Sequence, residues 1–160
     1  MNLIFSTFSN SQTAPLDTLQ AEDAGVYQSL SERQAQGHIV IHRDALATMG
    51  SIRDYLILYR DKIVVFQYSG HAGRDRLILD DKEAFSEGIA LLLARCPHLK
   101  LVVLNGCSTA GQVDLLLAHG IPMVIATSAP VNDRTATDFS IRFFKSLASN
   151  NETVQQKRDQ

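Results

Sequence analysis

Short, almost continuous apolar runs alternate along this chain with longer segments whose apolar residues return every three to four positions. The runs predict strands at residues 3–8, 38–42, 62–68, 101–104 and 123–126. The periodic segments between and after the runs predict helices, because a spacing of three to four places apolar side chains on one helical face. A shorter run at residues 76–80 predicts one strand of a surface hairpin.

This alternation predicts an α/β fold with a mostly parallel sheet of about five to six strands and helices on both faces, a three-layer α/β/α arrangement. The strands are apolar throughout rather than alternating, which is typical of strands covered on both faces. With 160 residues, the chain has room for one domain with a proper core. We expect that domain to span residues 1–148, followed by a polar tail at 149–160 that frays.

Composition narrows the classes of function. The formal net charge is −2, so no basic footprint for nucleic acid or for an anionic membrane surface is present. The apolar runs are too short to span a bilayer, and the first residues read as a strand rather than as a signal peptide. With only two cysteines, Cys96 and Cys107, a reducing, cytoplasmic setting is the better expectation. No cofactor and no metal site are expected, since phosphate-binding glycine motifs and Cys/His clusters are absent from the sequence.

The residues that could carry chemistry follow three of the predicted strands. In open parallel sheets, ligands bind beyond the carboxyl ends of the strands. His71 follows the third strand, Cys107 the fourth and Ser128 the fifth. Because neighbouring strands lie about 4.8 Å apart, adjacent strand ends can bring an imidazole and a thiol together.

A histidine beside a cysteine suits nucleophilic catalysis. A free thiol has a pKa of about 8.5, and a nearby imidazole or a helix N-terminus favours the reactive thiolate. The backbone N–H of Cys107 and one from the loop of His71 could form an oxyanion hole. Gly70, Gly73 and Gly106 would allow tight turns and close approach of a substrate.

Other chemistries fit less well. A phosphatase loop of the form Cys-x5-Arg fails because Val113 stands at the position of the arginine, and no G-x-S-x-G elbow occurs. Residues 6–13 are rich in hydroxyl groups, which leaves a flavodoxin-like flavin or nucleotide binder as a weaker alternative, although this loop lacks glycine.

Three motifs together resemble the CHAT domain family, bacterial relatives of caspases and separases. FQYSGHAG at residues 66–73 resembles the histidine motif of that family, and VLNGCSTA at residues 103–110 resembles its cysteine motif. The segment AHGIPMVIATS at residues 118–128 is similar to the one that follows. The resemblance runs from about residue 60 to residue 148.

The resemblance implies a caspase-like (clan CD) cysteine endopeptidase. His71 would be the base and Cys107 the nucleophile, and the N–H groups of Ala72 and Cys107 would stabilise the oxyanion. Ser128 and Asp133 are candidates for the substrate pocket, although Asp133 also suits a helix cap. Family members act in bacterial defence or regulated cell death, where a sensor or regulatory partner releases the cleavage of a protein substrate.

Two departures from the family pattern bear on activity. Ala72 stands where caspases have glycine after the histidine, a change that preserves the backbone donor. Caspase-like folds also continue beyond the helix expected to end near Leu147, with a further strand and pocket loops. The chain is therefore either a compact member or lacks a C-terminal part. The second hypothesis is a non-catalytic interaction or regulatory module with a caspase-like fold.

Overall fold

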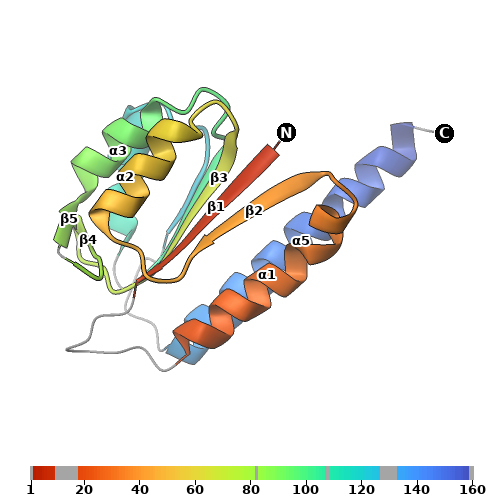
Figure 1. Cartoon of the computed structure of the whole chain (residues 1–160), viewed down its shortest axis with the longest axis horizontal. Helices are drawn as coiled ribbons and strands as arrows, with labels where there is room; N and C mark the ends of the chain where they lie inside the picture. The colour runs from red at the N-terminus through yellow and green to blue at the C-terminus, as the bar shows by residue number, and fades with distance from the viewer. Residues whose placement is uncertain (1, 10–17, 82, 107–108, 127–132, 159–160) are drawn as a thin grey trace.

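A five-stranded parallel sheet forms the centre of the computed structural model, which describes residues 2–9, 18–81, 83–106, 109–126 and 133–158 (Figure 1). In order across the sheet, the strands are β2 (Ile39–Asp44), β1 (Asn2–Ser9), β3 (Ile63–Gly70), β6 (Leu101–Asn105) and β7 (Val124–Ala126). Every neighbouring pair in this sheet is parallel. The order reverses between β1 and β3, and the carboxyl ends of parallel strands near such a point are where ligands bind.

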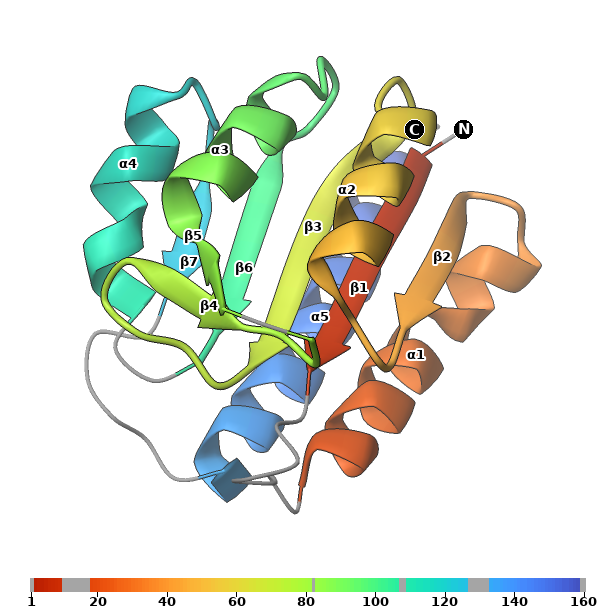
Figure 2. The ribbon, with the colours of Figure 1, turned by 60° about the vertical axis from the view of Figure 1, so that its left-hand side comes forward.

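Helices cover both faces of the sheet, as Figures 1 and 2 show. The helices are α1 (Leu19–Ala35), α2 (Met49–Leu58), α3 (Ser86–Ala94), α4 (Val113–Ala118) and α5 (Asp133–Arg158), with a short 3-10 turn, η1 (Thr109–Gln112), before α4. One apolar core lies between the sheet and α2, α3 and α4, and a second lies between the sheet and α1 and α5. The predicted three-layer α/β/α class is confirmed.

The apolar strand runs explain why both faces of the sheet are covered. Every residue from 3 to 9 in β1 and from 65 to 70 in β3 is buried. Val64, near the start of β3, is half-buried. Strands of this kind bury side chains above and below the sheet, so a helical layer on each side is required.

A small antiparallel hairpin follows the central strand β3. It consists of β4 (Arg76–Ile78) and β5 (Glu83–Phe85), and Figure 2 shows it in front of the lower ends of β3 and β6. The strand predicted at residues 76–80 is thus confirmed, with β5 as its partner. The hairpin lies beside the residues that follow β3, since Ile78 N–H donates to the carbonyl oxygen of His71 and Leu77 pairs with Ala72.

The last helix is longer than the sequence pattern predicts. We expected it to end near Leu147, whereas α5 continues to Arg158. Residues 149–158 contain no proline or glycine and include several good helix formers, so nothing in them stops the helix. Arg33 of α1 donates from Nη2 and Nε to the carbonyl oxygen of Ala148, at 2.8 and 3.1 Å, and so ties the two helices together. In the part of the chain that the structure describes, no helix is long and apolar enough to cross a membrane.

Candidate active site

The carboxyl ends of β3 and β6 lie side by side and carry the two residues that the sequence singles out. The last residues that pair these two strands with each other are Ser69 and Asn105. His71 comes two residues after the first of them, and Cys107 comes two residues after the second. His71 is half-buried, whereas Cys107 lies outside the described residues. The expected adjacency of the third and fourth strands of the sheet is confirmed.

The residue before Cys107 lies very close to the residues on both sides of His71. A Cβ built on Gly106 would lie 2.7 Å from the carbonyl oxygen of Gly70 and 2.9 Å from the Cβ of Ala72. Both distances are shorter than real Cβ contacts allow, so only glycine fits between these neighbours. The glycine before the cysteine therefore allows the two loops to approach closely.

Gly70 is the second position at this edge that requires glycine. Its φ of +156° is one that other residues rarely adopt. A Cβ there would collide with the carbonyl oxygen of Ser9 and would lie 2.8 Å from the hydroxyl of Tyr68. The chain can thus leave β3 for His71 only with a glycine at this point.

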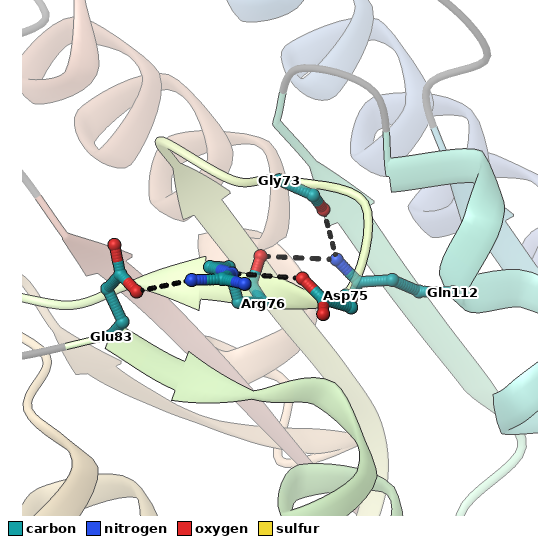
Figure 3. A network of polar contacts seen from close by, with 5 residues as sticks. All are labelled: Gly73, Asp75, Arg76, Glu83 and Gln112. Carbon is teal, nitrogen blue, oxygen red and sulfur yellow. Dashed lines mark hydrogen bonds and ion pairs between the residues drawn. The ribbon is translucent and has the colours of Figure 1, made fainter.

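The segment after Cys107 contacts the same histidine loop. Gln112 in η1 donates from Nε2 to the carbonyl oxygen of Gly73 at 2.9 Å and to that of Arg76 at 3.3 Å (Figure 3). A Cβ on Gly111 would lie 3.2 Å from the carbonyl oxygen of Arg74. Residues on both sides of positions 107–108 therefore pack against the loop of residues 70–76.

A buried phenol holds the main chain at His71. The hydroxyl of Tyr68 lies 2.5 Å from the carbonyl oxygen of His71 and 2.9 Å from that of Ile78, and these two acceptors share its one proton. Burial raises the pKa of Tyr68 well above its usual range, so this hydroxyl keeps its proton and remains a donor. The N–H of Ile78 also donates to the carbonyl oxygen of His71, at 3.0 Å.

The predicted oxyanion donor Ala72 is paired with Leu77 in an isolated antiparallel bridge. Both hydrogen bonds of this pair come from neighbours: Gly73 N–H donates to Arg76, and Ile78 N–H donates to His71. The pairing is the non-hydrogen-bonded type, so the N–H of Ala72 takes no part in it.

Charged side chains surround the outer end of the loop. The guanidinium of Arg76 lies between Asp75 and Glu83, with Nε–Oδ1 and Nη1–Oε2 distances of 2.9 and 2.7 Å (Figure 3). These ion pairs raise the pKa of Arg76, and Arg76 lowers the pKa of Asp75. Exposed pairs of this kind contribute little to stability. These ion pairs therefore affect the surface charge beside the loop of residues 70–76 more than its stability.

The structure describes only some of the remaining residues that the sequence singled out. Ser128 lies outside the described residues, and Asp133 is the first residue of α5, with a side chain that is also outside them. Cys96 is 5% exposed, and burial raises the pKa of its thiol to about 11, which confirms it as a core cysteine. Among the described residues, no group of three or more His, Cys, Asp or Glu side chains could hold a metal ion.

Sequence reasoning missed Glu22, a buried carboxyl beneath the site. It is 3% exposed and accepts hydrogen bonds from Ser69 and Asn105. A signal for it was present: Leu19, Glu22 and Val26 follow helical spacing, which places the glutamate on the apolar face of α1. A charged residue at such a position requires partners in the core.

Comparison with known proteins agrees with the motifs. The family model of the CHAT domain matches residues 3–159, almost the whole chain. No curated protein matches the chain. The family match, the parallel sheet with helices on both faces and the position of the histidine motif are mutually consistent, and the resemblance inferred from the motifs is confirmed. This chain belongs to the CHAT domain family, relatives of the caspase-like cysteine peptidases.

Proposed function

We propose that this chain is a cysteine endopeptidase in which Cys107 is the nucleophile and His71 is the general base. One observation supports it above others: the chain contacts the His71 loop both before and after Cys107, at Gly106 and at Gln112. Contacts on both sides of position 107 support the proposal, because a cysteine nucleophile and its histidine base must lie within hydrogen-bond reach of each other.

The proposed reaction is acyl transfer. His71 takes the proton of the Cys107 thiol, and the sulfur bonds to the carbonyl carbon of the scissile peptide. The N–H groups of Ala72 and Cys107 donate to the oxyanion that forms. The C–N bond then breaks as His71 returns the proton to the leaving amine. A water molecule, deprotonated by His71, hydrolyses the thioester and restores the thiol.

The proposal extends to partners. A protein or peptide substrate would contact Ser128 and Asp133, and a regulatory partner would control cleavage. The family resemblance supports a role in a bacterial defence or cell-death pathway in the cytoplasm. These points rest on the family and on the sequence.

Selective alkylation tests the pairing of His71 with Cys107. Iodoacetamide labelling, quantified for each cysteine by peptide mass spectrometry, should modify Cys107 much faster than the buried Cys96, which serves as an internal control. The substitution His71→Ala should slow the labelling of Cys107 and leave that of Cys96 unchanged. Equal, slow labelling of both cysteines would refute the proposal.

Proteolysis of natural substrates provides the second test. A proteome from which small peptides have been removed is incubated with the chain or with Cys107→Ala, and new N-termini are identified. Cleavage that depends on both Cys107 and His71 is expected. A partner that binds equally well to Cys107→Ala, with no cysteine-dependent cleavage, would instead favour the interaction module.

A further inference from the structure

A single buried carboxylate oxygen joins the two strand ends of the candidate site. Glu22 lies on α1, and its Oε1 accepts a hydrogen bond from Ser69 Oγ at 2.5 Å and one from Asn105 Nδ2 at 2.9 Å. Ser69 and Asn105 are the last two residues that pair β3 with β6. The contacts therefore cross from a helix to two adjacent strands at the point where both strands end.

Both donors to Glu22 lie close in sequence to the residues proposed for catalysis. Ser69 is two residues before His71, and Asn105 is two residues before Cys107. A displacement of either donor shifts the strand end that leads into its reactive residue. Because both donors share one acceptor atom, Glu22 links the two strand ends through side chains, in addition to the pairing of Ser69 with Asn105 in the sheet.

The same cluster includes α5. Asn105 uses its Nδ2 also for the carbonyl oxygen of Ala136, at 2.8 Å. Gln67, fully buried on β3, donates from Nε2 to Ser69 Oγ at 3.0 Å and to Ser140 Oγ at 3.1 Å. These hydrogen bonds join the start of α5 to β3 and β6, so the cluster connects two helices with two strands.

The cost of burial indicates that this carboxyl has a function beyond packing. Burial raises the pKa of Glu22, while hydrogen bonds from Ser69, Asn105 and Ser140 lower it and nearby Asp23 raises it further. Asp23 itself pairs with Arg43, at 2.8 Å. An apolar side chain would fill this space without a desolvation penalty, but it would offer no acceptor to Ser69 and Asn105.

We propose that Glu22 is a positioning residue that sets the separation of His71 and Cys107 by clamping Ser69 and Asn105 through one oxygen. The inference rests on the proposed cysteine peptidase function, because it concerns the geometry of that same pair. Glu22 touches no substrate in this account and acts through the two strand ends.

The test measures the rate of Cys107 alkylation against pH, which reports the apparent pKa of the thiol. Glu22→Ala leaves both donors without their acceptor and should lower the rate at neutral pH by about 10-fold, toward that of His71→Ala. Glu22→Gln retains an acceptor oxygen at the same place, and we expect it to restore most of the rate. Glu32→Ala, an exposed change on the same helix, is the matched control and should behave as wild type.

Two measurements separate positioning from loss of structure. Slow labelling of Cys96 shows that the core is intact, so a fall confined to Cys107 reports the site alone. Where Glu22→Ala does not fold, Ser69→Ala removes the β3 donor to Glu22 and one acceptor of Gln67 but leaves the contact of Asn105, and a smaller fall confined to Cys107 is expected. A variant that remains folded with an unchanged Cys107 profile, for either substitution, overturns the inference. If Cys107 is labelled at the same rate in wild type and in His71→Ala, the peptidase proposal itself is refuted. The two failures are therefore distinct.

Discussion

Replacing Gly106 with alanine tests the closest contact of the candidate site. The added methyl carbon would lie 2.7 Å from the carbonyl oxygen of Gly70 and 2.9 Å from the Cβ of Ala72. Neither neighbour is the far end of a flexible side chain, so neither can rotate away. One belongs to the main chain, and the other is held by the bridge to Leu77.

The geometry gives the size of the effect. To reach the 3.4 Å at which ordinary contact begins, the loops of His71 and Cys107 must separate by about 0.5–0.7 Å. Overpacking of this kind costs about 1–3 kcal/mol of the free energy of unfolding. A misplacement of about 1 Å between reacting groups can cost about 100-fold in rate, so a shift of roughly half that size predicts about a 10-fold slower alkylation of Cys107.

Urea denaturation and iodoacetamide labelling measure the two effects on the same variant. Gly88→Ala is the control, because a Cβ there meets nothing within 4 Å and alanine favours the helix. It should leave labelling unchanged and should not lower stability. If Gly106→Ala matches wild type in both assays, the close approach of the two loops is refuted.

Three further predictions concern the supports of the site. Tyr68→Phe removes the donor to His71 and should lower the free energy of unfolding by about 1–3 kcal/mol and slow Cys107 labelling, since it leaves buried acceptors with fewer donors; an unchanged midpoint in urea would contradict this. Gln112→Ala should slow the labelling of Cys107 at a stability cost of about 1 kcal/mol, whereas the exposed control Gln36→Ala should do neither; equal labelling of the two variants would show that the Gln112 contacts do not support the site. Because the pKa of Glu22 is raised in the folded state, the protonated form is favoured by folding, so its contribution is present below pH 4.5 and is lost as the pH rises through the folded value. The stability of wild type relative to Glu22→Gln should therefore fall as the pH rises above 4.5 in urea titrations, and a difference independent of pH would contradict the raised pKa of Glu22.

The apolar pattern carries most of the information about the fold. Continuous runs marked each strand of the sheet because both faces are covered, and the period of three to four marked the helices. The pattern did not predict the end of the last helix, because apolar periodicity marks only segments with a buried face. Helix α5 continues beyond Leu147 through helix propensity and contacts with α1, such as that of Arg33 with Ala148. Helix ends set by such contacts carry no local stop signal.

The site divides in the same way. His71 could be located from the sequence because glycine-flanked polar residues after strands have few structural explanations. The hydrogen bonds of Tyr68 and Gln112 could not, because both residues resemble ordinary core or helix positions until the loop of residues 70–76 is folded beside them. Their partners are main-chain carbonyl groups, which no residue type reveals.

Polar residues at core positions predict which elements of the fold meet. Gln67 and Ser69 interrupt the apolar run of β3, Asn105 ends that of β6, and Glu22 interrupts the apolar face of α1. Each alone is unfavourable in a core, because a buried polar group without a partner costs free energy. Together they hydrogen-bond to one another, with only the Oε1 of Gln67 left without a partner among these groups, and this requires that their elements meet at one place. Since two of the elements end shortly before the residues proposed for catalysis, such interruptions on separate elements predict both which strand ends are neighbours and where precise geometry is needed.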